Sequence, residues 1–260
     1  MKFKISIITV NYNNLEGLKK TIKSIITQTW QAFELIVIDG GSTDGSLAFI
    51  EENHASIDYW VSEIDKGVYH AMNKGIAKAN GEYLLFLNSG DHFYNETVLE
   101  DNHTQLNGKD IIYFNLNVIE GNTSFIKLYP NILSFSYFVE DTLPHPATFI
   151  KREAFSKTNL YNEDFRILSD WKFFIDAICQ FNLSYMKIEE TLSTFYIGGM
   201  SSNPENRSLK YQERQQVLTT SYPAYLQDMD DVLKLKKIVA TFRKSRIIKL
   251  LVKLRFLNRF

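Results

Sequence analysis

Short runs of β-branched and other apolar residues alternate with helical patterns over the first hundred residues of the chain. The runs cover residues 5–10 (ISIITV), 33–38 (FELIVI), 57–61 and 83–87 (YLLFL). Continuous apolar runs of about four to eight residues are typical of strands buried on both faces of a parallel sheet. Segments with the period of amphipathic helices separate them, at residues 15–27, around 47–50 and at 68–79. This order predicts right-handed βαβ units and an α/β fold, with a mostly parallel, Rossmann-like central sheet flanked by helices.

The rest of the chain is less regular but is still typical of a packed protein. Its 260 residues are 45% hydrophobic and 14% aromatic, which excludes an intrinsically disordered chain. Residues 111–118 and 124–128 predict a hairpin around a Gly-Asn turn, and a loop from residue 158 leads into an aromatic helix containing Trp171. The single cysteine, Cys179, excludes a disulfide framework and a cysteine-based zinc site, and it indicates a reducing compartment.

Polar residues follow the carboxyl ends of the predicted strands. They are Asn11, Tyr12, Asp39, Asp65, Lys66 and Asp91. Because parallel strands end at the same edge of a sheet, and ligands bind beyond that edge, these side chains are candidates for one site. Asp91 follows a buried strand, and such a carboxylate suits Mg²⁺ or Mn²⁺ together with phosphate oxygens of a substrate. The same residue types also form ordinary turns and helix caps, so a purely structural role stays open for each.

Three common enzyme signatures are missing from the sequence. The first strand is not followed by Gly-x-Gly-x-x-Gly, and neither a P-loop nor a Gly-x-Ser-x-Gly elbow occurs. This argues against a nicotinamide dehydrogenase, a P-loop phosphotransferase and an α/β hydrolase.

Three motifs, in order over residues 4–95, together resemble family 2 glycosyltransferases of the GT-A fold. They are VIDGGSTDGS at 37–46, DKGVYHAMNKGI at 65–76 and GEYLLFLNSGD at 81–91. Further on, LPHPATF at 143–149 and LSDW at 168–171 resemble the acceptor half of that family, and GGMSS at 198–202 is similar to a loop of bacterial members that build surface polysaccharides. The resemblance implies a nucleotide-sugar-binding half at residues 1–100 and an acceptor-binding, catalytic half at 101–215. Residues 216–260 would then form a basic, amphipathic helical tail.

The resemblance implies an inverting transfer of a sugar from a nucleotide-diphosphate sugar to a hydroxyl of a glycan acceptor. The implied donor-site residues are Val10, Asn11, Tyr12 and Asp39 at the base and Asp65 near the nucleoside, with Asn73, Ser89 and Gly90 of the same motifs as further donor contacts. Lys66 and Lys74 could neutralise phosphate charge, with solvated surface lysines as the alternative. Asp91 matches the last acid of the motif that holds Mg²⁺ or Mn²⁺ on the diphosphate, and Asp170 matches the general base. Inversion with one base needs no protein nucleophile, which agrees with these roles.

Other residues depart from the pattern or allow two interpretations. Gly40 stands where many members have a second acid, and residues 88–90 (NSG) replace the earlier acids of the metal motif. His145, between two prolines, is expected near the donor phosphate or the acceptor, with a structural histidine as the alternative. Trp171 is expected either to stack on a sugar or to lie in the core.

Charge is divided unevenly along the chain. Ten of the 29 Lys and Arg residues lie in residues 232–260, which contain no Asp or Glu, so residues 1–231 have a formal net charge of −11. Apolar and basic residues interleave there, and Lys249, Lys253 and Arg255 fall near one side of a helix predicted over 246–259. This pattern suits an anionic membrane surface, and a helix packed on the acidic body is the alternative. Nucleic acid is not expected as a partner, because the apolar content is high and no nucleic-acid-binding motif occurs.

The start of the chain predicts neither a signal peptide nor a membrane span. Its apolar run stops at Asn11, and no segment reaches the roughly 18 uncharged apolar residues that a spanning helix needs. Together with the basic tail, this predicts a cytoplasmic protein, peripheral on the inner face of the plasma membrane. The resemblance to the polysaccharide-building subgroup, with the tail, implies a polyprenyl-diphosphate-linked acceptor. The alternatives are a non-catalytic nucleotide-sugar-binding or scaffold protein, which needs no carboxylate at Asp170, and a nucleotidyltransferase of the same fold.

Overall fold

The computed structural model describes residues 4–200, 202–254 and 256–257. Its strands are β1 Ile5–Asn11, β2 Phe33–Asp39, β3 Tyr59–Ser62, β4 Tyr83–Phe86, β5 His92–Phe93, β6 Ile111–Glu120, β7 Thr123–Lys127, β8 Thr148–Lys151 and β9 Tyr185–Tyr196. Its α-helices are α1 Leu15–Ile26, α2 Ser46–Glu52, α3 Val68–Lys78, α4 Val98–Asn102, α5 Phe135–Glu140, α6 Ala154–Lys157, α7 Ser169–Ile175, α8 Arg207–Ser221, α9 Pro223–Leu226, α10 Met229–Lys244 and α11 Arg246–Lys253. Short 3₁₀ turns cover His54–Ser56, His103–Gln105, His145–Ala147 and Pro204–Asn206, and Asp176–Gln180 is π-helical.

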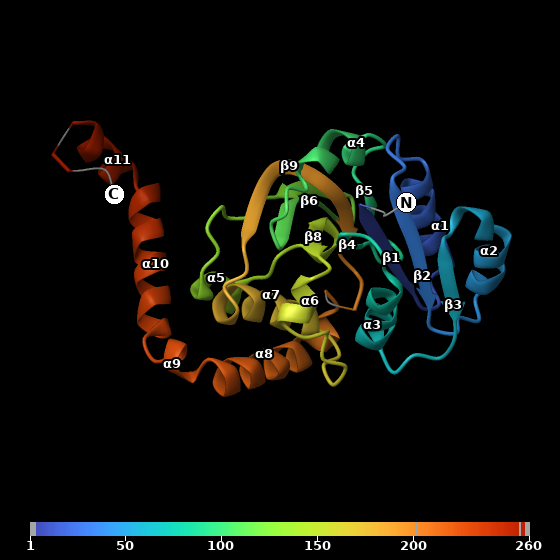
Figure 1. The fold of residues 1–260 in the computed structure, drawn as a ribbon. Helices are drawn as coiled ribbons and strands as arrows, with labels where there is room; N and C mark the ends of the chain where they lie inside the picture. Colours follow the sequence, from blue (N-terminus) through green and yellow to red (C-terminus); the bar gives the residue numbers. More distant parts are fainter. Residues whose placement is uncertain (1–3, 201, 255, 258–260) are drawn as a thin grey trace.

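A continuous sheet in the order β3-β2-β1-β4-β8-β6-β9-β5 runs through the body of the molecule, with β7 paired to β6 (Figure 1). Of the strands from the first hundred residues, β3, β2, β1 and β4 form a parallel set, as predicted, whereas the two-residue β5 is antiparallel to β9. The second half of the sheet is mixed, because β8 is antiparallel to β4 and β6, whereas β9 is parallel to β6. The predicted hairpin is present as β6 and β7, which turn at Gly121.

Helix α3 lies unusually close to the sheet. A Cβ atom on Gly75 would lie 2.5 Å from Cγ2 of Ile8 in β1, so only glycine allows this approach. The close packing fixes the position of α3 relative to the carboxyl ends of the strands, where the candidate site residues lie.

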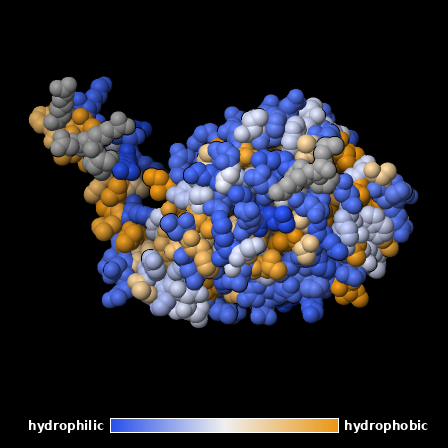
Figure 2. Space-filling view, viewed as in Figure 1, coloured by the Kyte–Doolittle hydropathy of each residue, from blue (hydrophilic) through white to orange (hydrophobic). Residues whose placement is uncertain are grey.

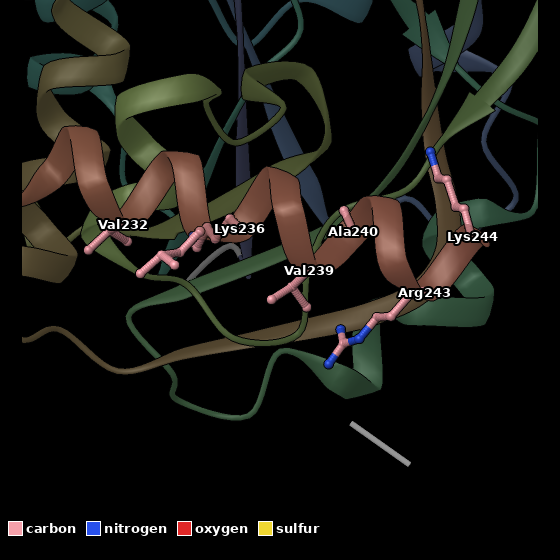
Figure 3. A pocket seen from close by; sticks show the side chains of 7 residues that line it. Val232, Lys236, Val239, Ala240, Arg243 and Lys244 are labelled. Carbon is pink, nitrogen blue, oxygen red and sulfur yellow. The ribbon is translucent and has the colours of Figure 1, made fainter. Parts of the chain in front are cut away.

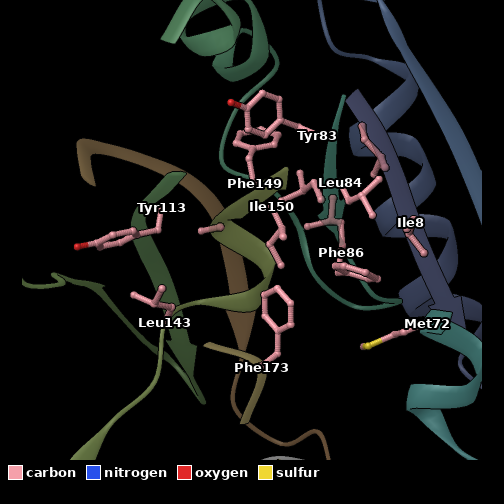
Figure 4. Close-up of a cluster of buried hydrophobic side chains, with 14 of the residues drawn as sticks. Ile8, Met72, Tyr83, Leu84, Phe86, Tyr113, Leu143, Phe149, Ile150 and Phe173 are labelled. Atoms are coloured by element: carbon pink, nitrogen blue, oxygen red, sulfur yellow. The ribbon is translucent and has the colours of Figure 1, made fainter. Parts of the chain in front are cut away.

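One hydrophobic core joins the two halves of the body (Figure 4). Tyr83 and Leu84 from β4 lie beside Phe149 and Ile150 of β8, from the second half, and all four are buried. Fully burying one side chain of this size contributes roughly 1.5–3 kcal/mol. The shared core therefore holds the elements of the two halves in a fixed relative position.

The chain leaves the body through α8 and continues as an arm of α9, α10 and α11 (Figure 1). Helix α8 packs on the body through Val217 and Leu218, whereas α10 contacts α5, where Lys236 donates a hydrogen bond to Ser136. Side chains along the rest of α10 are almost all exposed, so most of α10 is not packed on the acidic body. Within the part of the chain that the structure describes, the helices are all too short or too polar to cross a membrane.

The predicted helix over residues 246–259 is only partly within the described residues. Helix α11 begins after Ser245, whose hydroxyl accepts the Ile248 N–H, and ends at Lys253. Arg255 and Arg259 lie outside the described residues, as does Ser201 of the GGMSS loop.

Candidate active site

The carboxyl ends of β1 and β2 meet at Asp39, whose carboxylate accepts hydrogen bonds from several neighbours. Asp39 is fully buried, and its two oxygens accept hydrogen bonds from Asn11 Nδ2 (2.7 Å), Ser42 and Ser62. Burial raises the pKa of Asp39, but the hydrogen bonds from Ser42, Ser62 and Asn11 outweigh this and hold it below its ordinary value. The ionised group therefore clamps the turn after β2. The prediction that Asp39 reads the donor base is not supported, because no oxygen of its carboxylate faces solvent.

Three neighbouring residues, Tyr12, Gly40 and Asp65, lie together beyond this turn. Tyr12 is 68% exposed, and a Cβ on Gly40 would lie 3.2 Å from its ring and 3.6 Å from Oδ2 of Asp65. That Oδ2 is buried and has no hydrogen-bond partner. Glycine at position 40 thus leaves room beside an aromatic ring and an unsatisfied carboxylate oxygen, which together suit the base and ribose of a nucleoside.

Helix α3 presents two pairs of residues to two different neighbours, because residues four apart lie on one face of a helix. His70 and Lys74 face Asp65: His70 Nδ1 lies 2.7 Å and Lys74 Nζ 2.6 Å from its Oδ1. Burial lowers the pKa of Lys74, but the bonds to Asp65 and Glu63 raise it above its ordinary value overall. The predicted phosphate contact of Lys74 is therefore not supported, because this lysine holds Asp65 in place.

The other pair on α3, Tyr69 and Asn73, faces the loop before α7. Asn73 donates to the Tyr161 carbonyl oxygen (2.8 Å) and accepts from the Tyr161 N–H (3.1 Å). Its side-chain amide is thus engaged by the protein, and a donor-binding role for Asn73 is not supported. Lys66, in the exposed turn before α3, has no such engagement described and stays a predicted donor contact.

The turn that follows β4 is held by α1 and β1. Asn14 Nδ2 donates to the Ser89 carbonyl oxygen (3.0 Å), and Thr21 Oγ1 accepts the Gly90 N–H (3.0 Å). The Val10 carbonyl oxygen accepts the Ser89 N–H (3.1 Å), so Val10 contributes its backbone while its side chain is in the core. Gly90 has φ of 110°, which other residues rarely adopt. These contacts fix the turn rigidly beside a cavity.

A first cavity, of about 450 Å³, lies beyond this turn. Its lining includes Asn88, Ser89, Gly90, Asp91, Tyr69, His145, Asp170 and Met200. Burial raises the pKa of Asp91 to about 8, and Asn88 Oδ1 is buried without a hydrogen-bond partner. A divalent cation would compensate the buried charge of Asp91 and give Asn88 Oδ1 a partner. Mg²⁺ and Mn²⁺ prefer such oxygen ligands. Among the described residues no group of three or more His, Cys, Asp and Glu side chains forms a preformed metal site, so a cation here would need further ligands from phosphate and water.

A second cavity, of about 500 Å³, adjoins the first. The two share His145, Pro146, Ile167, Asp170 and Phe195 in their linings. Asp170 therefore stands in a wall between two spaces, where its carboxylate can accept a proton from a group in one while a bond breaks in the other.

Asp170 is positioned from two sides by residues that the sequence did not single out. Tyr69 Oη lies 2.8 Å from Asp170 Oδ1 and 2.6 Å from the Ile167 carbonyl oxygen, so its one proton is available to either acceptor. On the other side, Glu213 of α8 accepts hydrogen bonds from the N–H groups of three successive residues before α7, at 2.7 to 3.1 Å. The sequence signal for Tyr69 was its place within DKGVYHAMNKGI, whereas Glu213 lies in a segment without a motif.

His145 lies at the junction of the two cavities, as expected for a residue near donor or acceptor. It is nonetheless nearly buried, stacks on Phe86 with ring centroids 4.7 Å apart, and its Nε2 lies 2.8 Å from Tyr161 Oη. Burial lowers the pKa of His145, so the imidazole is neutral at physiological pH. It therefore supplies shape and hydrogen bonding at the junction but no positive charge.

Trp171 is a core residue in this structure. Its side chain is fully buried, its Nε1 donates to the Phe138 carbonyl oxygen (2.8 Å), and the Arg214 guanidinium lies over its ring at 4.8 Å. The predicted stacking on a sugar is therefore not supported, and the alternative of a core tryptophan is the one that fits. Trp171 instead forms the platform for Arg214.

Comparisons with known proteins identify the family of this chain. The sequence profile of glycosyl transferase family 2 matches residues 6–177. An uncharacterized glycosyltransferase of Mycobacterium tuberculosis is 34% identical over 183 residues, which are 68% of this chain and 70% of that protein. A cholesterol galactosyltransferase of Borreliella burgdorferi is 35% identical over 115 residues, which are 43% of this chain and 32% of that protein.

Two solved structures share the fold. S. aureus TarS 1-349 in complex with UDP-GlcNAc superimposes with a TM-score of 0.62 at 16% identity, over 84% of this chain and 68% of that chain. The mannosyltransferase PcManGT from Pyrobaculum calidifontis, in complex with GDP-Man and Mn²⁺, gives 0.57 at 14% identity, over 96% and 79%. The chain belongs to glycosyl transferase family 2, and it is a glycosyltransferase with a GT-A fold.

Proposed function

We propose that this glycosyltransferase moves a sugar, with inversion at the anomeric carbon, from a nucleotide-diphosphate sugar to a hydroxyl of an acceptor. The observation that carries the proposal is the position of Asp170 between the two cavities, one of which also contains Asp91. In this arrangement the donor diphosphate occupies the first cavity, and the acceptor hydroxyl enters through the second.

The donor is held at two points. Tyr12 and Asp65 Oδ2 receive the nucleoside, with Lys74 and His70 fixing Asp65. Asp91 and Asn88 would hold Mg²⁺ or Mn²⁺, whose charge supports departure of the diphosphate. The relatives solved with UDP-GlcNAc and with GDP-Man and Mn²⁺ support this choice of donor class and cation, although their likeness concerns the fold alone.

Asp170 acts as the general base. As the acceptor oxygen attacks the anomeric carbon, the bond to the diphosphate oxygen breaks, and the acceptor proton passes to the carboxylate. Tyr69 donates a hydrogen bond to Oδ1, which directs the other oxygen, Oδ2, to the incoming hydroxyl. A base placed this way contributes roughly 10²- to 10⁴-fold in rate.

A thermal-shift screen of UDP- and GDP-sugars, each with Mn²⁺ or with EDTA, tests the donor class. A donor at a hundred times its Kd should stabilise the protein by about 2.7 kcal/mol. The proposal expects one donor to do so only with Mn²⁺, and NMR of the product should show the inverted anomer. Absence of stabilisation by any of these donors, or a retained anomer, would contradict it.

Tyr69→Phe should lower kcat by about ten- to hundred-fold and leave the KM for the donor unchanged, because charge-assisted hydrogen bonds contribute about 1.5–3 kcal/mol. Steady-state kinetics with varied donor measure kcat and KM separately. Tyr83→Phe is the matched control, since it removes another buried tyrosine hydroxyl, one bonded to the Lys109 carbonyl oxygen far from the cavities. Equal kinetics for wild type and Tyr69→Phe would refute the positioning role.

We infer from the helical arm that the protein is cytoplasmic and is held peripherally on the inner face of the plasma membrane. Apolar side chains gather on the arm (Figure 2). A closer view shows Val232 and Val239 along α10, with Arg243 and Lys244 at its end (Figure 3). In α11 the side chain of Ile247 is 71% exposed. Exposed apolar residues interleaved with bases suit an anionic bilayer surface, at about 1 kcal/mol per basic residue near it. We infer that the acceptor is membrane-borne, such as a polyprenyl-diphosphate-linked glycan, and the relative named for cholesterol supports a lipid acceptor.

Deletion of residues 232–260 should abolish binding to anionic liposomes. Sedimentation with phosphatidylglycerol vesicles measures it, and neutral vesicles and high salt should weaken binding of the full chain. Donor binding by the truncated protein serves as the control for folding. Sedimentation of the truncated chain at the wild-type level would place the membrane contact elsewhere.

A further inference from the structure

The charged side chains that line the first cavity do not balance one another. Asp91 and Asp170 are its carboxylates, whereas Arg166 is the one Lys or Arg among the described residues of its lining. His145, in the same lining, is neutral at physiological pH because burial lowers its pKa. A diphosphate that enters this cavity therefore meets two carboxylates, and Arg166 is the side chain of the lining that offsets them.

Arg166 is fixed through its backbone, which leaves its side chain available. Its N–H donates to Oε1 of the buried Glu213 at 2.7 Å. The next residue, Ile167, is held from two sides, because its N–H donates to Glu213 Oε2 at 3.1 Å and its carbonyl oxygen accepts from Tyr69 Oη at 2.6 Å. The Arg166 side chain itself is exposed. A long cationic side chain on so rigid a base can contact a ligand in the cavity with little loss of backbone freedom.

Arg166 lies on the donor side of the proposed base. Ile167 and Asp170 line both cavities, whereas Arg166 lines the first alone. In an inverting displacement, the leaving group departs on the face of the anomeric carbon opposite to the incoming oxygen. With the acceptor in the second cavity, the group that departs is the diphosphate in the first, where Arg166 lies.

We propose that Arg166 binds the donor diphosphate and stabilises it as it leaves. Mn²⁺ beside an ionised Asp91 leaves one positive charge to set against a diphosphate that carries two negative charges. As the bond from the anomeric carbon to the diphosphate oxygen breaks, its electron pair stays on that oxygen and adds a third negative charge, while the acceptor proton passes to Asp170. The planar guanidinium suits phosphate oxygens, and its contact strengthens as this charge develops.

The inference rests on the proposed function, because it takes the first cavity as the site of the donor diphosphate. It adds a residue that binds the leaving group to the base and the cation already proposed. It also predicts an order of affinities. Arg166 should contribute most to binding of the free nucleoside diphosphate, less to binding of the nucleotide sugar, and nothing to binding of the nucleoside.

Titration of the full chain and of Arg166→Met with three probes tests this order. The probes are UDP, UDP-GlcNAc and uridine, and in parallel GDP, GDP-mannose and guanosine, all with saturating Mn²⁺ at pH 8, where the terminal phosphate is ionised. Arg166→Met should weaken binding of the nucleoside diphosphate by about ten- to hundred-fold. Binding of the nucleotide sugar should weaken by a smaller factor, and binding of the nucleoside, followed by NMR, should not change.

Two further variants make the result specific. Arg166→Lys keeps the charge but not the planar fork, and should recover part of the lost affinity. Arg207→Met removes the same charge from an exposed position on α8 that lies outside the linings of both cavities, and should bind all probes as the wild type does. Because every substitution at position 166 keeps the backbone bond to Glu213, thermal unfolding of the three variants should match that of the wild type.

The contrary outcomes separate this inference from the proposed function. Wild-type affinity of Arg166→Met for UDP and GDP would overturn the inference alone, as would an equal loss for nucleoside, nucleotide sugar and nucleoside diphosphate, which indicates a general disturbance of the site. Failure of the wild-type protein to bind either nucleoside diphosphate with Mn²⁺ would refute the proposed donor site, and the role of Arg166 with it.

Discussion

Asp170→Asn should lower kcat by about 10²- to 10⁴-fold while the affinity for the nucleotide-sugar stays at the wild-type level. The substitution keeps the shape of the side chain, and its amide oxygen can still accept the hydrogen bond from Tyr69. It removes the basic oxygen that takes the acceptor proton. Because Asp170 stands in the wall between the cavities, rather than at the nucleoside end of the first, donor binding should not depend on it.

Initial rates with saturating donor, together with donor titration, measure the two quantities separately. Asp164→Asn is the matched control, because Asp164 is an exposed acid only a few residues earlier in the chain. Thermal unfolding in the absence of donor shows whether either variant is less stable. Turnover by Asp170→Asn within a few-fold of wild type would remove Asp170 from the role of base.

Asp91→Asn should abolish activation by Mn²⁺ and, in EDTA, should raise the thermal stability of the protein. Burial raises the pKa of Asp91 from 3.8 to about 8, so between these pH values the folded protein binds a proton that the unfolded chain releases. The free energy of unfolding therefore falls as pH rises through this window, and asparagine, which does not ionise, removes that dependence. The gain in Tm should be absent near pH 4 and largest near pH 8.

The same proton should compete with the cation in the wild-type protein. Mn²⁺ affinity is therefore expected to rise by about tenfold per pH unit from pH 6 until it levels off near pH 8. Mn²⁺ titrations with bound nucleotide at several pH values measure this, with Asp164→Asn again as the control. Affinity that is independent of pH, or a Mn²⁺ response that survives in Asp91→Asn, would refute the role of Asp91.

The sequence predicts the first half of the fold well because its strands are buried on both faces. The continuous apolar runs of β1, β2 and β4 leave no other interpretation. By contrast β9 was not predicted: it carries the exposed acids Glu189 and Glu190 in its middle, which interrupt any strand pattern. Strand β8 is only four residues long and was likewise missed, because so short a run has no period to read.

The site shows a similar division. Resemblance singled out Asp91 and Asp170, both of which line the first cavity, but it could not reveal that one residue of α3 contacts Asp170 and the next contacts Asp65. Tyr69 and His70 are adjacent in sequence, yet successive helical residues point about 100° apart, so one contacts Asp170 and the other Asp65. The contacts of Asn73 and Lys74 with Tyr161 and Asp65 could not be predicted for the same reason, since a motif reports residue types and not which neighbour each side chain meets.

Anomalous diffraction at the manganese edge, from crystals grown with Mn²⁺ and the donor nucleotide chosen by the screen, tests the central claim most directly. We predict a manganese peak within coordination distance of Asp91, with the nucleoside beside Tyr12 and Asp65 and the diphosphate in the first cavity, facing Asp170. A nucleotide bound outside this cavity, or a manganese ion away from Asp91, would contradict the account.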